Sequence, residues 1–266
     1  MIKKVVILWE DGILKIVNIN NMCRIVFLSD THGLHSTMTN QLPKGDVLIH
    51  SGDVSNVGKE DEVIEFVKWF NDLEGFKHKI FIAGNHDFGF EDNRIRHGHE
   101  SPWLDRLVEE GKLPKLNCVY LEDSEYIINS DDLSKPIKVY GSPWQPEFFN
   151  WAFNLPRNGV DLQDKWNNIP DDTDILITHG PAYGYLDISP KGNMRVGCEL
   201  LTMRINEIKP LIHAFGHIHH SHGLIFNTDT YFVNSSICDE RYRPKNNPFI
   251  IDLNEVYGEL VVTIVN

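Results

Sequence analysis

The sequence predicts a mixed α/β sandwich, and three features of the chain favour this fold class. From Arg24 onward, short apolar runs of strand length alternate with helical or irregular segments. The segment Glu60–Leu73 carries apolar residues at helical spacing, which is typical of a helix that covers a sheet. Near the C-terminus, residues 249–253 and 260–265 return to strand-like runs.

The first 22 residues are expected to form an N-terminal extension that precedes a single domain over residues 23–266. Val5–Trp9 and Ile13–Ile19 have the pattern of two strands, and Glu10-Asp11-Gly12 between them is typical of a turn. A β-hairpin is therefore the candidate structure. Three roles stay open for it: completing a sheet edge, forming a surface for a partner, or being dispensable.

The elements of the main domain follow in chain order. The predicted helix Glu60–Leu73 has acidic residues in its first turn, which favour the helix dipole, and a second helix, Gly197–Ile208, ends before Pro210. Ser130–Asn168 is predicted to be a long ordered loop region around one strand, Ile137–Tyr140. The other predicted strands are Ile25–Leu28, Val47–Ile49, Lys79–Ala83, Ile175–Ile177, Leu211–Phe215, Thr230–Asn234, Phe249–Leu253 and Leu260–Val265.

The composition is ordinary for a globular protein and the charge is acidic. Hydrophobic residues make up 41% of the 266 residues and the net charge is −13, which argues against a general binder of long nucleic acid or of anionic membranes. The four cysteines form no CxxC pair, which favours reduced thiols. The apolar run Val5–Trp9 is too short for a signal peptide or a membrane span. We therefore expect a soluble, cytoplasmic protein.

Five short polar clusters each follow one of the predicted strands. Ligands in open α/β sheets collect beyond the carboxyl ends of the strands, so clusters spread over the sequence are expected to converge at one edge. The clusters are Asp30-Thr31-His32, Gly52-Asp53, Gly84-Asn85-His86-Asp87, His179-Gly180 and Gly216-His217-Ile218-His219.

The residue types in these clusters predict a centre of two metal ions. They offer carboxylate, amide and imidazole donors without a thiolate, which suits Mn²⁺ first and Fe, Zn²⁺, Co²⁺ or Mg²⁺ as alternatives. Seven such side chains are too many for one four-coordinate ion and suit two ions, with Asp53 as the natural bridge. Two ions would favour in-line displacement at a phosphoester by a metal-bridging hydroxide. The seven candidates are Asp30, His32, Asp53, Asn85, His179, His217 and His219.

This ordered set of motifs resembles the calcineurin-like metallophosphoesterase superfamily, over about Arg24 to Leu253. Further segments resemble its metallophosphoesterase-domain-containing branch, and the resemblance implies a four-layer αββα sandwich with the site at the loop ends of two sheets. One departure bears on the substrate: Gly52–Gly58 lacks the Asp and the Arg that protein Ser/Thr phosphatases carry there. The segments of the branch are Gly141-Ser142-Pro143-Trp144, Phe149-Asn150-Trp151, Phe153–Arg157, Thr178–Pro181 and Arg195–Cys198.

The resemblance also implies a role for each position of the motifs. One metal would be held by Asp30, His32 and His219, and the other by Asn85, His179 and His217, with Asp53 shared. His86 matches the superfamily's histidine that contacts the phosphate and acts on the leaving oxygen, and Asp87 is the candidate for orienting it.

Weaker candidates for substrate binding are Arg195, Trp144 and His220. An arginine can grip a phosphate or form a surface ion pair, and a large aromatic in a Pro-rich loop more often packs than stacks on a ligand. His220 is taken as a loop residue that faces substrate. His50 is the best candidate for supporting a metal ligand from behind.

The sequence therefore predicts a phosphoester hydrolase, with a small phosphodiester such as a cyclic nucleotide as the first substrate guess by resemblance. The alternatives are a phosphomonoesterase or nucleotidase, a hydrolase with a single ion, and a weakly active metal-binding scaffold of the same fold. The intact set of seven ligands argues against the scaffold. The native metal and the oligomeric state stay open.

Overall fold

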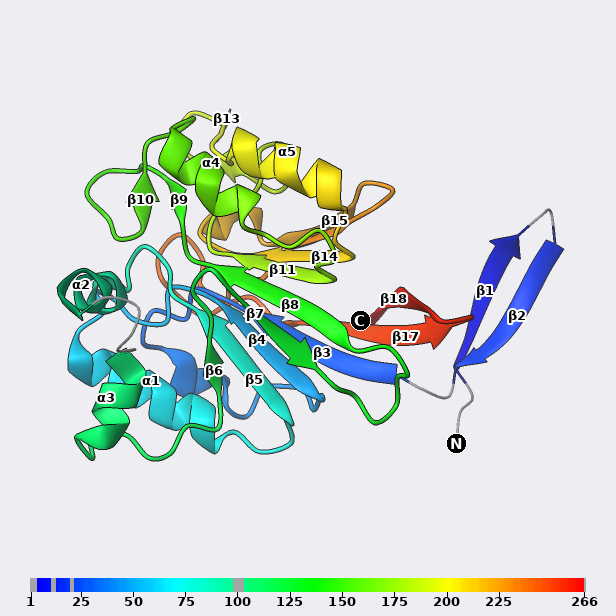
Figure 1. Ribbon diagram of the computed structural model, residues 1–266, viewed down its shortest axis with the longest axis horizontal. Helices are drawn as coiled ribbons and strands as arrows, with labels where there is room; N and C mark the ends of the chain where they lie inside the picture. The colour runs from blue at the N-terminus through cyan, green and yellow to red at the C-terminus, as the bar shows by residue number, and fades with distance from the viewer. Residues whose placement is uncertain (1–3, 11–12, 20–21, 98–102, 266) are drawn as a thin grey trace.

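Two six-stranded mixed sheets pack face to face with helices on both outer sides (Figure 1). The computed structural model describes residues 4–10, 13–19, 22–97 and 103–265. Helices α1 (Glu60–Asp72) and α3 (Trp103–Glu109) lie over one sheet, and α4 (Val160–Asn167) and α5 (Glu199–Ile208) over the other. The layers run helix, sheet, sheet, helix, which confirms the predicted fold class.

The first sheet has the strand order β18-β17-β3-β4-β5-β6. Neighbours from β3 to β6 pair in parallel, whereas β17 pairs antiparallel with β3 and with β18. The carboxyl ends of the four parallel strands therefore meet at one edge. The bounds are β3 Met22–Leu28, β4 Val47–Ser51, β5 His78–Ile82, β6 Val119–Tyr120, β17 Phe249–Val256 and β18 Glu259–Val265.

The second sheet has the order β15-β16-β14-β11-β8-β7. Its four central strands are parallel, and β15 and β7 pair antiparallel at the two edges. This sheet thus also presents four parallel strand ends. The bounds are β7 Ser124–Ile128, β8 Ile137–Ser142, β11 Ile175–Thr178, β14 Ile212–Phe215, β15 Gly223–Phe226 and β16 Tyr231–Asn234.

Alternation along the strands divides the interior into two kinds of core. In β3, Ile25 and Phe27 face the partner sheet, and Val26 and Leu28 face the helices. On the helix side, α1 buries Val63, Phe66, Val67 and Phe70, the apolar stripe that the sequence predicted. Burial on both faces is why these strands are nearly continuous apolar runs.

Helix α4 was missed by sequence analysis, which predicted a loop region over residues 130–168. This helix has only eight residues, and its buried side chains are Leu162 and Trp166, four positions apart. Two apolar residues in a polar segment are too few for a periodic signal. Helices α2 (Phe88–His97) and α3 were not predicted either. Short 3-10 turns lie at His35–Met38 and His219–Ser221.

Three further strand pairs lie outside the two sheets. β1 (Lys4–Glu10) pairs antiparallel with β2 (Ile13–Ile19), and the pair lies to one side, next to β17 (Figure 1). The expected turn at Asp11-Gly12 lies outside the described residues, and Met22, taken above as the end of the extension, begins β3. The other pairs are β9 (Gln145–Pro146) with β10 (Asn154–Leu155), and β12 (Ile188–Ser189) with β13 (Met194–Arg195).

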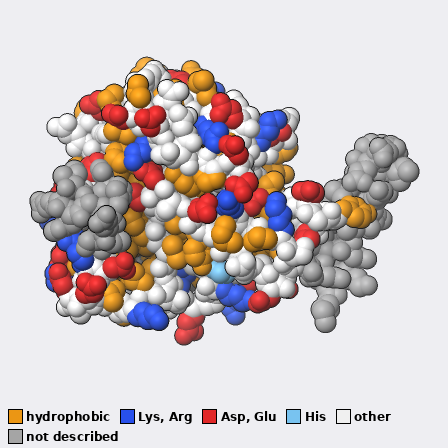
Figure 2. Space-filling model, viewed as in Figure 1, with side chains coloured by type: hydrophobic (Ala, Val, Ile, Leu, Met, Phe, Trp, Pro, Cys, Tyr) orange, Lys and Arg blue, Asp and Glu red, His pale blue; other side chains and the backbone are white. Residues whose placement is uncertain are grey.

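None of the helices in the described part of the chain combines the length and the apolar character that crossing a bilayer requires. On the face shown in Figure 2, acidic and basic side chains are interspersed among apolar ones and form no continuous basic stripe among the described residues.

Gly141 on β8 lies where the two sheets come close together near the strand ends. A Cβ atom added there would lie 2.6 Å from Cβ of Leu121 and 2.8 Å from Cγ2 of Ile82 on β5. Cβ of Leu121 is attached to the backbone, and Cγ2 of Ile82 belongs to a stiff β-branched side chain, so neither atom can move away. The glycine therefore lets the sheets lie close enough to share one site.

Gly141→Ala is expected to lower the free energy of unfolding by about 1–3 kcal/mol, because the added methyl overpacks this contact. Gly223→Ala is the matched control, since its Cβ would meet Leu186 at an ordinary 3.4 Å. Urea denaturation of both variants measures the difference. Equal stabilities would show that the sheets can separate at no cost.

Candidate functional site

The five polar clusters meet where the parallel strands of both sheets end. Asp30 follows β3, Asp53 follows β4 and Asn85 follows β5, whereas His179 and His217 follow β11 and β14 of the other sheet. Four of the candidate ligands have left-handed backbone conformations, which cost about 1–3 kcal/mol each and gather at functional sites. Their φ angles are 53° at Asp30, 42° at His32, 54° at Asp53 and 64° at His217.

Asp30, His32 and His219 form the first group of side chains that could hold a metal ion. Nε2 of His219 lies 3.1 Å from Oδ1 of Asp30 and 3.2 Å from Nε2 of His32. Nδ1 of His219 donates to the carbonyl of Asp239 at 3.0 Å, so its Nε2 is directed to the group. Asp30 is fully buried and also accepts hydrogen bonds from the Ser236 hydroxyl and the His217 amide.

Asp53, His179 and His217 form a second group. Nε2 of His179 lies 3.3 Å from Oδ2 of Asp53 and 3.0 Å from Oδ1 of Asn85. Nδ1 of His179 donates to the carbonyl of Ser51 at 2.9 Å, which directs Nε2 into the group. The same carboxylate oxygen of Asp53 lies 3.7 Å from Nε2 of His32, so Asp53 stands between the two groups.

Glycines before the ligands allow the backbone to come this close. A Cβ on Gly216 would lie 1.9 Å from Oδ2 of Asp30, and one on Gly84 would lie 2.3 Å from Oδ1 of Asp53. Any side chain at either position would displace a carboxylate. These contacts explain why Gly precedes Asn85 and His217 in the sequence.

The two buried carboxylates and the histidines shift one another's pKa values. Burial alone raises the pKa of Asp30 and of Asp53, but the neighbouring His219 and His179 outweigh it and hold both carboxyls below their usual range. Burial lowers the pKa of His179 and His219, but the same carboxylates raise it to about 9. The negative charge is thus balanced by protons, which a cation could replace.

His86 lies beside both groups with its ring held from two sides. Nδ1 donates to the carbonyl of Asn56 at 2.7 Å, and the ring stacks on Trp151 with centroids 4.2 Å apart. The backbone amide of His86 donates to Oδ1 of Asp53 at 2.8 Å. Because Nδ1 is occupied, Nε2 is the nitrogen that remains for chemistry in the site.

The carboxylate of Asp87, predicted to orient His86, has other hydrogen-bond partners than the His86 ring. The buried carboxylate of Asp87 accepts from the backbone amides of Val54, Ser55 and Gly84 and from the Ser55 hydroxyl, at 2.6–3.1 Å. It ties the loop after β4 to the loop after β5, while Asn56 and Trp151 hold the His86 ring. Burial and the charge of Asp53 raise the pKa of Asp87 to about 6.

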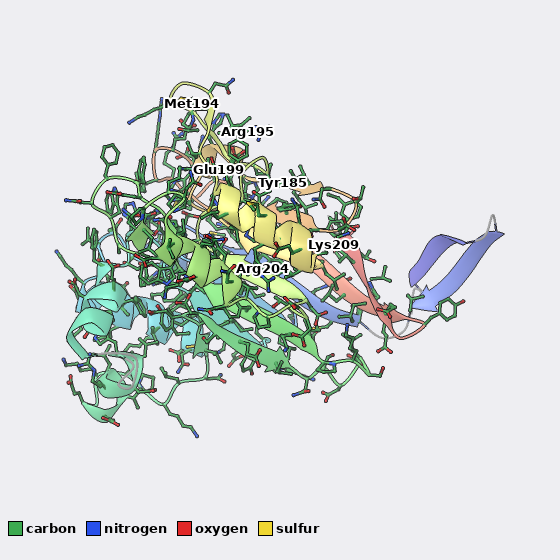
Figure 3. The ribbon with its side chains drawn as sticks, turned by 45° about the horizontal axis from the view of Figure 1, so that its top comes forward. Tyr185, Met194, Arg195, Glu199, Arg204 and Lys209 are labelled. Atoms are coloured by element: carbon green, nitrogen blue, oxygen red, sulfur yellow. The ribbon has the colours of Figure 1, made fainter. Side chains whose placement is uncertain are left out.

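Two of the three weaker substrate candidates lie outside the pocket. Trp144 is buried, and its indole donates to Asp123 at 2.9 Å, so the favoured packing role fits it better. Arg195 pairs with the buried Asp187 at 2.6 Å and lies with Met194 at the tip of the β12–β13 pair, beyond the start of α5 (Figure 3). His220 does line the pocket, where it pairs with Glu240 at 2.6 Å.

A pocket of about 340 Å³ opens in front of the two groups. Three aromatic side chains on its walls, Phe148, Trp151 and Tyr242, were not assigned to the site from sequence. Tyr242 has a φ of 56° and its ring meets that of His32 edge-on, with centroids 4.7 Å apart. Phe149-Asn150-Trp151 was noted as a motif, but no periodicity marks which of its aromatics faces the site.

A second layer of histidines supports the ligands from behind. Nε2 of His50 lies 2.9 Å from the Thr31 hydroxyl, and Nε2 of His213 lies 2.8 Å from the Thr178 hydroxyl. The two pairs stand in corresponding places in the two sheets, each threonine next to a ligand. Burial lowers the pKa of both histidines to about 3.

Comparison with known proteins places this fold and site in a family. A model of the calcineurin-like phosphoesterase family matches residues 23–221. The chain is 43% identical over 240 residues to human metallophosphoesterase domain-containing protein 1, across 86% of this chain and 71% of that protein. It is 38% identical over 238 residues to a UPF0046 protein of Caenorhabditis elegans, across 88% and 82%.

Solved structures show the same fold at low sequence identity. TT1561 of Thermus thermophilus superposes with a TM-score of 0.55 at 13% identity, over 92% of this chain and 100% of that chain. The phosphopantetheinyl hydrolase PptH of Mycobacterium tuberculosis gives 0.52 at 14%, over 84% and 92%. Our chain belongs to the calcineurin-like phosphoesterase family, as its motifs predicted.

Family members generally bind divalent metal ions, and the donors present here fit such ions. Three overlapping groups of three side chains each gather ligand atoms within 4.8 Å of one another, and each combines a carboxylate oxygen with imidazole nitrogens. The carboxylates of Asp30 and Asp53 are buried among histidines, and glycines allow the backbone to approach them. The negative charge of this site suits cations.

Asp87→Asn is expected to lower the free energy of unfolding by about 1–3 kcal/mol, because an amide nitrogen cannot accept the hydrogen bonds that the carboxylate takes. Urea denaturation of the metal-free protein measures this. If the variant kept full stability and lost only turnover, Asp87 would act on His86 after all.

The acid sensitivity of the fold should decrease in His213→Gln. In the folded protein the pKa of His213 is about 3, against 6.5 for an ordinary histidine, so between these pH values the unfolded chain binds the extra proton. Stability then falls as the pH drops from about 6.5 toward 3. In the variant, the slope of the free energy of unfolding against pH should be smaller by up to about 1.4 kcal/mol per pH unit. Urea titrations between pH 7 and pH 4 measure this slope. Parallel profiles for the two proteins would contradict burial of a neutral His213.

Proposed function

We propose that this protein is a phosphodiesterase that uses two divalent metal ions to hydrolyse a small phosphodiester such as a cyclic nucleotide. Membership of the family supports a phosphoester hydrolase. The observation that carries the two-metal proposal is the position of Asp53, whose Oδ2 faces His179 at 3.3 Å and His32 at 3.7 Å. One carboxylate oxygen thus faces a histidine of each group.

The candidate ligands would be divided between the two metal ions. Asp30, His32 and His219 would hold one ion, Asn85, His179 and His217 the other, and Asp53 would belong to both. When bound, the two cations supply a water of lowered pKa and positive charge against the phosphoryl oxygens. Mn²⁺ is the first choice, since the donors are carboxylate, amide and imidazole.

His86 is proposed as the residue that acts on the leaving oxygen. Its Nδ1–H is engaged by Asn56, so Nε2 is free to contact the phosphate or to deliver a proton to the departing alkoxide. The Trp151 stack keeps the ring from turning away. His86 also groups with His32 and Asp53 as a potential ligand, so its role needs a direct test.

The aromatic part of the pocket favours a diester over a monoester. Arg157 lines the pocket, but its guanidinium donates to the carbonyls of Val196 and Gly197 and to Glu199 at 2.6–2.7 Å. The carboxylates of Glu147 and Glu240 line the pocket as well. Lys191 lines the pocket too, and Glu240 pairs with His220, so the charges of the wall are partly balanced. The preference for a diester rests on its second alcohol, which would fill the aromatic part of the pocket.

A cytoplasmic setting is proposed on the chemistry of the thiols. The four cysteines are free and buried, and burial raises the pKa of Cys23 and Cys238 to about 12. Such thiols are suited to a reducing compartment.

The first test is hydrolysis by metal-stripped protein of bis-p-nitrophenyl phosphate and p-nitrophenyl phosphate, with and without Mn²⁺. We expect Mn²⁺-dependent turnover, faster on the diester, two ions per chain, and loss of most activity in Asp53→Asn. One tightly bound ion would favour a mononuclear hydrolase. Faster monoester cleavage would make the protein a phosphomonoesterase, and no turnover with Mn²⁺, Fe²⁺, Co²⁺ or Zn²⁺ would favour the metal-binding scaffold.

His86→Ala should lower kcat by about 10²–10⁴ while the metal content stays at the wild-type value, because a general acid is removed without a ligand. Metal analysis of the purified variant accompanies the kinetics. A variant that loses an ion would identify His86 as a ligand instead.

A further inference from the structure

Gln145 on β9 is a buried polar side chain on the wall of the pocket. It is 2% exposed and lines the same pocket as His86 and His217. Its backbone amide donates to the carbonyl of Phe153 at 3.1 Å, which fixes the strand there. No proposed step of hydrolysis uses this residue.

The orientation of the Gln145 amide follows from its neighbour Asn154. Nδ2 of Asn154 donates to the carbonyls of Phe148 and Phe149, at 3.1 and 3.0 Å, so Oδ1 of Asn154 is the atom that remains to accept. Nε2 of Gln145 faces that oxygen at 3.4 Å. A flipped Gln145 would put two oxygens together, so its Oε1 points the other way.

Oε1 of Gln145 has no hydrogen-bond partner among the described residues, although it is buried. A buried carbonyl oxygen without a partner is unfavourable, and native proteins keep such groups where water, an ion or a ligand satisfies them. Oε1 of Gln145 is therefore available to accept a hydrogen bond from a molecule bound in the pocket.

The acceptor lies next to the second group of candidate ligands. A Cβ on Gly180, which directly follows His179, would lie 3.5 Å from Oε1 of Gln145. A phosphate oxygen of a diester is itself an acceptor and would be repelled by this carbonyl. The partner must be a donor on the alcohol part of the substrate, close to the ester oxygen.

We propose that Gln145 reads a hydroxyl group on the carbon next to the scissile ester, so that the preferred substrates are phosphodiesters of vicinal diols such as ribonucleotides. This inference rests on the proposed phosphodiesterase function. A neutral amide suits the task, because it accepts from a hydroxyl without adding charge beside the phosphate.

The test compares kcat/KM for 3′,5′-cyclic AMP and for its 2′-deoxy analogue, which lacks the vicinal hydroxyl. Wild-type protein should prefer the ribose compound by at least about tenfold, and Gln145→Leu should bring the ratio close to one. The melting temperature of this variant should change little, since the loss of the long Nε2 contact to Asn154 offsets the removal of an unpaired oxygen. Gln163→Leu, on the exposed side of α4, is the matched control and should keep the wild-type ratio.

Gly180→Ala gives a second, independent variant. Its methyl would contact Gln145 at ordinary distances of 3.4–3.5 Å, so the fold is preserved while the acceptor is covered, and the ratio should fall as well. A wild-type ratio near one, or a ratio that both variants leave unchanged, would overturn the role of Gln145. Hydrolysis of bis-p-nitrophenyl phosphate by the wild type separates these outcomes from failure of the proposed function, in which no diester is cleaved.

Discussion

The structure depends on burying two carboxylates, Asp30 and Asp53, against histidines from the opposite sheet. An isolated buried carboxylate is strongly unfavourable, and for each of the two the other half of the molecule supplies histidine partners. Asp30 receives them from His217, His219 and Ser236, and Asp53 from His179. The sheets must therefore dock in one register, with Gly141 allowing the approach.

Much of this arrangement could be predicted because it follows from local patterns. Buried strands appear as apolar runs, α1 as an amphipathic stripe, and the strand ends as Gly and Asp or His clusters. The parallel pairing then brings Asp30 and Asp53 to the end of one sheet and His179 to the end of the other, and the packing of the two sheets brings these ends together. Helix α4 could not be predicted in this way, because its two buried apolar residues are too few to show a helical periodicity.

The walls of the pocket could not be predicted, because they depend on tertiary contacts without sequence periodicity. Trp144 and Trp151 lie in the same Pro-rich segment, yet one packs beside Asp123 and the other stacks on His86. Asp87 follows His86 directly, yet its carboxylate binds two loops. Adjacency in sequence says little about where side chains point in an irregular loop, since each φ and ψ redirects them.

The separation of the site's partners along the chain has a consequence for synthesis. Asp30 is made early, but His217, His219 and Ser236 follow it by 187 to 206 residues. While the ribosome adds the second sheet, strands β3 to β6 carry Asp30 and Asp53 without the partners that later bury them. The carboxylates in the early half of the chain thus lack their histidine partners until nearly all of the protein has been synthesised. Capture of ions would be among the last events of folding, and would signal that both halves are present.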